Sequence, residues 1–353
     1  MLGRGARRGS GRRRLAALLL LPAAAGFARQ AGSAGEQAWT LALAAPAPHA
    51  SLALEPLPAL PQLDCARCHA DIAREWAVTA HAHAWIDPVY RKALEDKRRP
   101  ESCHGCHIPT PLLQEPEERF GKKPLPRAAD EEALELGIGC NACHAGPEGA
   151  IHGPFGAPTE AHASVQDARF QGTGSNALCG ACHRTSVGPV IGVAKDFEEA
   201  GLEARGMSCA GCHMQAVERP LGTDAAGAAT EARAGRSHAL QTPRDASFLA
   251  QAFALEARRE GGGAVLAIRN RAGHRVPGLV GRRMVFAVAA LDAAGAVLGE
   301  VEHTVDETAY LPLAGVVSLR LPGEAAALRV TGTHFPPEAK AGIPFLSQTL
   351  ALP

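Results

Sequence analysis

Apolar and polar positions divide the chain into two parts of different character. After about residue 243, short apolar runs are separated by Gly-rich and charged turns, a pattern that indicates β-strands. The segment DAAGA, between two of these runs, is typical of a hairpin turn. The pattern therefore predicts an antiparallel β-sandwich-like domain over residues 244–353. Its expected strands are residues 264–270, 284–292, 296–305, 316–321 and 327–335.

Before residue 243, helical periodicity is limited to short segments. In residues 71–78, Ile72, Ala73 and Trp76 share one side of a helix. Pro- and Gly-rich sequence separates such segments, so we expect a mainly helical, loop-rich domain over residues 62–243. The expected fold class is α+β, with this domain first and the β domain second. Further short helices are expected at residues 130–136, 196–204 and 245–252.

The N-terminus has the organisation of an export signal. A basic stretch ends at Arg14, and an apolar run from Leu15 to about Ala25 precedes small residues, so we assign residues 1–28 to a signal peptide. That run is shorter than the roughly 20 residues that a bilayer span needs, so no stable membrane span is expected after cleavage. Residues 29–61 are Ala- and Pro-rich and are expected to form a linker. The mature protein is expected to be periplasmic or otherwise exported.

One motif, C-x-x-C-H, uses all ten cysteines of the chain. It occurs five times, and each copy ends in a histidine. Successive copies begin 30 to 40 residues apart, with no close sequence repeat between them. The residues are Cys65, Cys68 and His69; Cys103, Cys106 and His107; Cys140, Cys143 and His144; Cys179, Cys182 and His183; and Cys209, Cys212 and His213.

Disulfides and zinc explain these cysteines poorly. Exported proteins use paired cysteines for disulfides, and C-x-x-C is a zinc half-site, but neither requires a histidine after every second cysteine. C-x-x-C-H is the attachment sequence of c-type haem. Its two thiols bond the porphyrin, and its histidine is the proximal iron ligand. The sequence thus predicts five covalently bound c-type haems, which would supply apolar core area that the chain's 4% aromatic residues do not.

The other histidines are candidates for the sixth iron ligands. Several of them lie in elements that resemble the multihaem cytochromes c related to the tetrahaem cytochrome c of ammonia oxidisers and to hydroxylamine oxidoreductase. The similar segments are WAVTAHAHAWIDPVY, APTEAHASVQDARF, RSHAL and NRAGHRVPG, the last in a turn found in relatives that append a β domain. This resemblance implies distal ligation by His81, His162, His238 and His274.

The ligand of one haem is left open at this level. His83 competes with His81, while His152 and His104 compete for the remaining iron, which could also be five-coordinate. Met207 and Met214 flank the last motif as weaker candidates. If His274 is a ligand, it attaches the β domain to the haem domain through iron.

Mostly bis-histidine haems have no free coordination position, which indicates outer-sphere electron transfer. We therefore expect an exported pentahaem electron carrier that serves redox partner proteins of a respiratory chain. The alternative is a multihaem oxidoreductase, in which one five-coordinate haem acts on a small nitrogen or sulfur compound. No catalytic side chains can be selected from the sequence. With 36 basic and 36 acidic residues, the net charge is zero, so a nucleic-acid partner is not expected.

Overall fold

The computed structural model describes residues 64–129, 137–156, 159–186 and 192–353. The expected signal peptide, the linker and the helix at 130–136 lie outside these residues. Among the residues described, none of the helices has both the length and the hydropathy of a membrane span.

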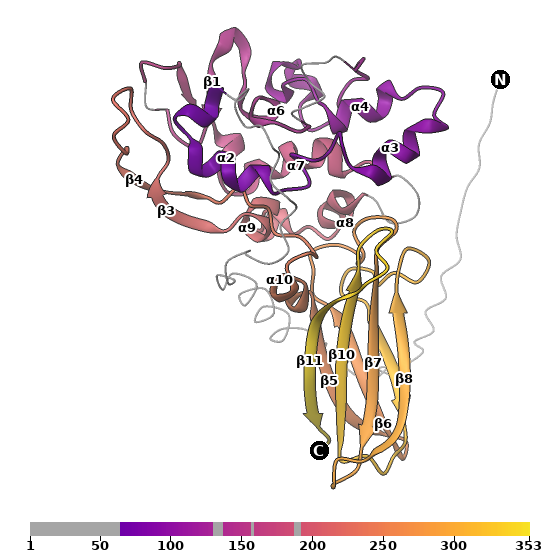
Figure 1. The fold of residues 1–353 in the computed structure, drawn as a ribbon. Helices are drawn as coiled ribbons and strands as arrows, with labels where there is room; N and C mark the ends of the chain where they lie inside the picture. Colours follow the sequence, from indigo (N-terminus) through magenta and orange to yellow (C-terminus); the bar gives the residue numbers. More distant parts are fainter. Residues whose placement is uncertain (1–63, 130–136, 157–158, 187–191) are drawn as a thin grey trace, which may run out of the picture.

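The first part consists of short helices joined by loops (Figure 1). The α-helices, including the one that leads into the second part, are α2 (Ala70–Ala77), α3 (Pro88–Glu95), α4 (Glu101–His107), α6 (Cys140–His144), α7 (Ser175–His183), α8 (Val193–Glu199), α9 (Cys209–His213) and α10 (Ala246–Gln251). The 3-10 turns are η2 (Asp64–Arg67), η3 (Leu112–Gln114), η4 (Glu117–Arg119), η5 (Pro147–Gly149), η6 (Ala168–Phe170), η7 (Gly172–Gly174) and η8 (Glu203–Arg205).

Four of the five C-x-x-C-H motifs form the last turn of an α-helix, in α4, α6, α7 and α9. Cysteines three residues apart and a histidine one position later share one face of such a turn. Local capping fixes some of these turns: Ser208 precedes α9 and its hydroxyl accepts a hydrogen bond from Gly211 N at 3.0 Å. A one-turn helix therefore presents two thiols and one imidazole to a single partner group.

The second part is a sandwich of two antiparallel sheets. One sheet has the order β11-β10-β7-β8 and the other β5-β6-β9. Two small ribbons, β1-β2 and β3-β4, belong to the first part. The strands are β1 (Ile151–Gly153), β2 (Ser164–Gln166), β3 (Ala216–Pro220), β4 (Ala232–Arg236), β5 (Phe253–Glu260), β6 (Gly263–Asn270), β7 (Arg283–Leu291), β8 (Val297–Val305), β9 (Val316–Leu321), β10 (Ala327–Phe335) and β11 (Ile343–Ala351).

Alternating burial along the strands produces one apolar core between the two sheets. On β10, Leu328 and Val330 are fully buried while Arg329 and Thr331 face solvent. Aromatic rings occupy the centre, where the Phe286 ring packs edge-on against Phe253 and Phe345 at centroid distances of 5.0 and 5.7 Å. The core of this part consists of side chains alone.

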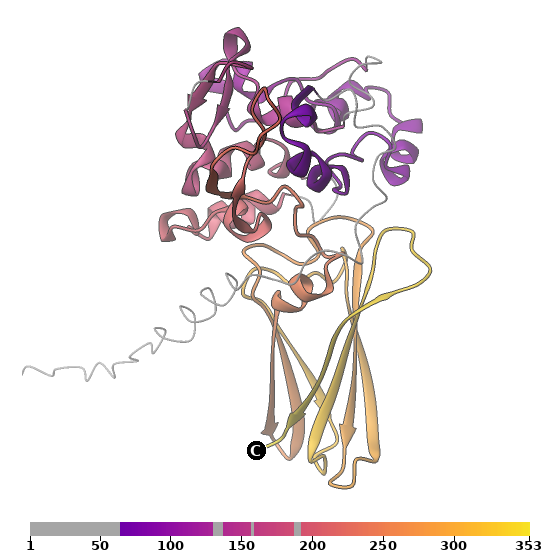
Figure 2. The same cartoon turned by 60° about the vertical axis from the view of Figure 1, so that its left-hand side comes forward.

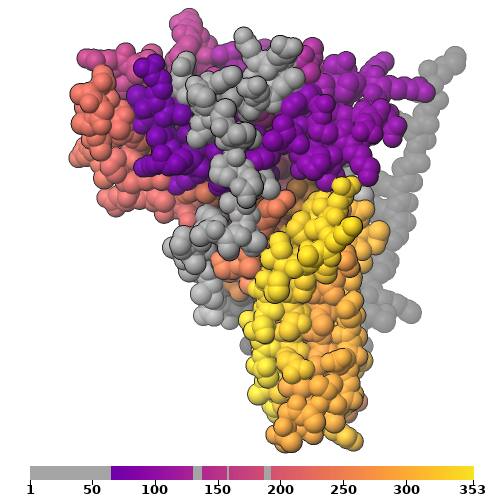
Figure 3. Space-filling view, viewed as in Figure 1, coloured from indigo at the N-terminus to yellow at the C-terminus, as the bar shows by residue number. Residues whose placement is uncertain are grey.

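The two parts meet at one end of the sandwich. The strands extend away from the helical part, and α10 lies between the two (Figures 1 and 2). In the space-filling view the sandwich projects from the helical part as an elongated body (Figure 3). An ion pair of 3.3 Å between Lys92 on α3 and Glu338 in the β10–β11 loop joins them at the surface. On the side of the sandwich, the meeting surface is therefore formed by strand ends and loops.

The structure confirms the expected fold class, a helical and loop-rich part followed by antiparallel sheets. All five expected strands are present within a residue or two of their predicted bounds, and α10 lies within the expected 245–252. The helix expected at 196–204 begins earlier, at Val193, and ends at Glu199. The terminal strands β5 and β11 were missed, although Phe253, Leu255 and Ala257 alternate along β5.

Candidate functional site

The histidines that end the C-x-x-C-H motifs are oriented by backbone carbonyls. In four of the five, the ring Nδ1 donates a hydrogen bond to a carbonyl oxygen outside the motif, which leaves Nε2 as a lone-pair donor. The bonds are His69 to Leu221 (2.6 Å), His107 to Ala84 (2.8 Å), His144 to His152 (2.7 Å) and His213 to Gln241 (2.8 Å). This tautomer and orientation are those required of a metal-ligating imidazole.

A glycine allows the closest of these approaches. A Cβ on Gly222 would lie 2.9 Å from both His69 Nδ1 and the Cys68 carbonyl oxygen. Only glycine therefore lets the segment that carries the Leu221 carbonyl pass so close to the first motif.

Four of the five motif histidines face a second histidine from another part of the chain. The ring centroids of the two members are separated by 6.1 to 6.5 Å in every case. The pairs are His69 with His162 (6.5 Å), His183 with His81 (6.2 Å), His144 with His238 (6.1 Å) and His213 with His274 (6.2 Å).

This separation is too large for ring contact and fits an iron between the rings. An imidazole–metal bond is about 2 Å long, so two imidazoles on opposite sides of one metal have ring centres about 6 Å apart. The thiols of each motif lie on the same helical turn as its histidine. The residues present therefore fit covalently attached haem with two axial histidines.

Desolvation favours the neutral form of three of the facing histidines. It lowers the pKa of His81 to about 3, and it lowers those of His238 and His274 to about 4. The positive charge of the facing motif histidine adds to the shift in each of them. A neutral imidazole is the form that binds a metal, so these side chains are ready to ligate at neutral pH.

His274 reaches its partner from the β domain. Its loop is held on α8 by Arg275, whose backbone N and side-chain Nε donate to Asp196 Oδ2 at 3.0 and 2.6 Å. Asn270 Nδ2 donates to the His274 carbonyl at 2.9 Å from within the sandwich. The two domains thus position this imidazole together.

His238 is held by a carboxylate of the first segment. Glu75 on α2 accepts hydrogen bonds from His238 N (2.8 Å) and from both terminal nitrogens of Arg219 (2.7 and 2.8 Å). Through these hydrogen bonds, the Glu75 carboxylate joins α2 to β3, which carries Arg219, and to the segment after β4, which carries His238. Sequence reasoning missed this link because Glu75 and Arg219 carry no motif.

The second motif has different surroundings. No described histidine ring faces His107 at the separation of the other pairs; instead, Tyr90 of α3 stacks on it with centroids 3.6 Å apart. The Tyr90 hydroxyl is buried and has no hydrogen-bond partner among the described residues. Trp85 packs edge-on against Tyr90 at 6.1 Å, and Arg91 lies over the Trp85 ring. This motif is surrounded by aromatic and cationic side chains.

The competing histidines make other contacts. His152 Nδ1 donates to Asp167 Oδ2 at 2.8 Å, and its ring packs so closely on Gly146 that a Cβ there would lie 2.2 Å from Nε2. His104 donates from Nδ1 to the Arg127 carbonyl (3.0 Å) and packs on Trp85. His83 donates to the Thr79 carbonyl at 2.9 Å. None of these three rings forms a ring pair with a motif histidine among the described residues.

Contacts between thiols show which motifs are neighbours in space. Thiol–thiol hydrogen bonds join Cys65 to Cys140, Cys106 to Cys182 and Cys179 to Cys209; they raise the pKa of one thiol of each pair. The first motif thus adjoins the third, and the fourth adjoins both the second and the fifth. The third and fourth are also close, because the charge of Cys143 raises the pKa of Cys182.

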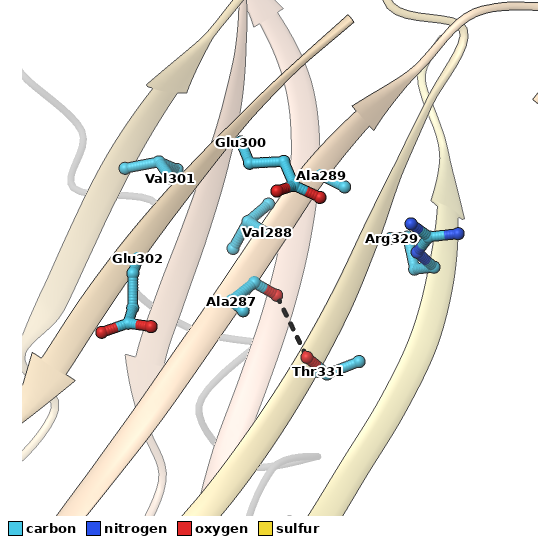
Figure 4. A pocket seen from close by; sticks show the side chains of 8 residues that line it. All are labelled: Ala287, Val288, Ala289, Glu300, Val301, Glu302, Arg329 and Thr331. Atoms are coloured by element: carbon cyan, nitrogen blue, oxygen red, sulfur yellow. Dashed lines mark hydrogen bonds between the residues drawn. The ribbon is translucent and has the colours of Figure 1, made fainter. Parts of the chain in front are cut away.

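A groove on the outer face of the four-stranded sheet lies away from this chemistry. Glu300 and Glu302 of β8 lie on one side of it and Arg329 of β10 on the other (Figure 4). None of its lining residues is a cysteine or a histidine.

Comparison with known proteins gives a family match over part of the chain and one solved structure of similar fold. Residues 64–145 match the family described as cytochrome c554 and c-prime. A solved structure, a penta-heme cytochrome c552 from Thermochromatium tepidum, has a similar fold, with a TM-score of 0.56 and 18% sequence identity over 81% of this chain and 97% of the other. No curated protein sequence matches the chain. The resemblance inferred from the motifs is thereby confirmed.

Proposed function

We propose that the chain is a multihaem c-type cytochrome and, more specifically, an exported pentahaem electron carrier; residues 64–145 match the cytochrome c554 and c-prime family. The observation that carries this proposal is the set of four facing histidine pairs at 6.1 to 6.5 Å. Haem iron held by two histidines supplies reversible one-electron transfer without a free coordination position.

The proposed ligands follow from the pairs. His69, His144, His183 and His213 are proximal ligands, and their distal partners are His162, His238, His81 and His274 in that order. The carbonyls that accept hydrogen bonds from three of these proximal rings raise the basicity of the ligands. Two histidines without methionine favour low reduction potentials.

Neighbouring thiols support a branched order of the haem sites. The first, third and fourth would form a line, and the second and the fifth would both adjoin the fourth. Electrons that enter at the first or third site would therefore pass the fourth site before they reach the second or the fifth. Redox partner proteins of a respiratory chain are the expected donors and acceptors.

A second candidate function rests on the second motif. His107 has Tyr90, and no described histidine, against its ring. If this iron is five-coordinate, it could bind a small nitrogen or sulfur compound while the four other sites exchange electrons with it. The protein would then be an oxidoreductase with one reactive haem.

Spin-state spectroscopy of the purified holoprotein tests both functions. We expect a mass increase of five haems and a high-spin signal from one haem in five. Cyanide or nitrite should shift that signal alone if the second iron is open. A fully low-spin spectrum, unchanged by these ligands, would rule out the reactive haem and leave the carrier. Free thiols in place of bound haem would contradict both proposals.

A further inference from the structure

Three basic side chains converge where the sandwich meets the haem domain. Arg244 lies in the segment before α10, Arg282 directly precedes β7, and His334 lies near the end of β10. Phe335 pairs with Arg283 and His334 with Met284 across the ladder, which places Arg282 beside the His334 end of the strand. We call these three residues the junction cluster.

His334 is a buried polar group with at most one weak backbone partner. The residue is 1% exposed, and neither ring nitrogen makes a hydrogen bond of normal geometry to a described residue. The Pro243 carbonyl acts on the ring and opposes the effect of burial on its pKa. His334 occupies an inward position of β10, in the series that includes Leu328 and Val330, at the end of the apolar core. A buried imidazole nitrogen left unsatisfied costs about 1–3 kcal/mol unless another group pairs with it.

The two arginines add positive charge at the same place. Both arginines are half-buried, and neither guanidinium forms an ion pair with a described residue. Burial, together with the charge of Arg244, lowers the pKa of Arg282 to about 10. Burial and then the charges of Arg282 and Arg244 lower the pKa of His334 to about 4. The charge of Asp87 opposes these effects and raises the pKa of Arg282.

An excess of buried positive charge requires an anionic partner. Guanidinium groups recognise carboxylates and oxyanions through paired N–H donors, and a neutral imidazole adds one further donor. We propose that the junction cluster binds one anionic oxygen group, a carboxylate or a small oxyanion.

Two sources of such a group exist, and the first rests on the proposed haem at the second motif. Asp87 caps α3, the helix whose Tyr90 stacks on His107, and its charge acts on both Arg282 and His107. Lys92 of the same helix pairs with Glu338, four residues beyond His334, which places α3 against the end of β10. The junction cluster and the second motif thus both adjoin α3, and a propionate of that haem is one source of the carboxylate. The second source is a free oxyanion from solution.

The test compares Arg244→Gln and Arg282→Gln holoprotein with the wild type. Arg329→Gln is the matched control, because Arg329 lies on the same strand as His334 but faces solvent. Thermal unfolding is measured in sodium sulfate and in sodium chloride of equal ionic strength. The reduction potentials of the haems are measured by spectroscopic titration, and haems are counted by intact mass.

Sulfate stabilises folded proteins in general, so the diagnostic quantity is the sulfate response of each cluster variant relative to Arg329→Gln. A free oxyanion site predicts a larger sulfate response in the wild type and in Arg329→Gln than in both cluster variants. A bound propionate predicts the same sulfate response in all four proteins; instead, each cluster variant lowers the potential of one haem, because the uncompensated carboxylate favours the ferric state.

Two cluster variants that match Arg329→Gln in sulfate response and in every potential would overturn the proposal. The haem count separates this result from failure of the proposed function. A sample without the second haem contradicts the pentahaem assignment, while the response to sulfate still reports whether the cluster binds an anion.

Discussion

At the scale of the residue, the proposed function depends on neutral imidazoles whose ring nitrogens are oriented toward a metal position. His213 donates from Nδ1 to the Gln241 carbonyl and faces His274, with the two rings inclined by only 13°. The adjacent cysteines alone predict its proximal role, which stays a prediction. His274 was suggested as its partner only by the resemblance, because no local pattern marks a histidine that faces another domain.

Removal of His274 should expose one iron. In His274→Ala, the facing pair with His213 is lost, so we expect a new high-spin haem signal from one further haem in five. Low-temperature spin-state spectra of the holoprotein measure it. His303→Ala is the control, because His303 lies on β8 and forms no ring pair with a motif histidine. An unchanged low-spin spectrum would show that His274 is not a ligand.

At the scale of the element, each motif helix is too short to be stable alone. Helix α6 has five residues, so its orientation must come from contacts such as the hydrogen bond from His144 to the His152 carbonyl. The β-strands differ, because their own sequence pattern indicates them. Their alternation is local and strong, which is why β6 to β10 could be predicted closely and the loops that hold the distal histidines could not.

The Asp196–Arg275 pair should contribute to the docking of the β domain. Asp196→Asn removes a mostly buried charge partner, and we expect a loss of about 1–3 kcal/mol of unfolding free energy at neutral pH. Burial opposes ionisation of Asp196, but the hydrogen bonds from Arg275 outweigh it and hold its pKa below the ordinary value.

A lowered folded-state pKa means that this stabilisation is complete above the unfolded pKa of about 4 and is lost as the pH falls through the folded pKa. Denaturant unfolding of wild type and Asp196→Asn should therefore differ by a constant amount from pH 5 to 8 and converge in stronger acid. A difference that grows on acidification would contradict this role.

The sandwich core should be coupled to the fifth haem. Phe286 is fully buried, and Phe286→Ala should cost about 3–5 kcal/mol. If the β domain unfolds, His274 leaves its partner, so the loss of β-sheet circular dichroism and the appearance of high-spin haem should share one denaturant midpoint. Val297→Ala, at a position 48% exposed, is the control. Separate midpoints in the variant would show that the domain unfolds without releasing the ligand.

At the scale of the whole molecule, the sequence predicts the kind of cofactor but not which motifs lie next to one another in space. Spacing alone predicts haem attachment by all ten cysteines and their five histidines, but it does not predict the contact of Cys106 with Cys182, which links motifs far apart in the chain. The surroundings of His107 were also hidden, because Tyr90 looks like any aromatic residue of an amphipathic helix. Such arrangements arise from packing between distant segments.

The long separation of each histidine pair has a consequence for maturation during export. In the proposed exported carrier, the chain would cross the membrane N-terminus first, so every C-x-x-C-H segment would emerge before His274, which lies beyond the last of them. The thiols of Cys209 and Cys212 would then be open to haem attachment while the opposite side of that haem is still uncovered. With His274 as the proposed ligand, folding of the sandwich would close this site last.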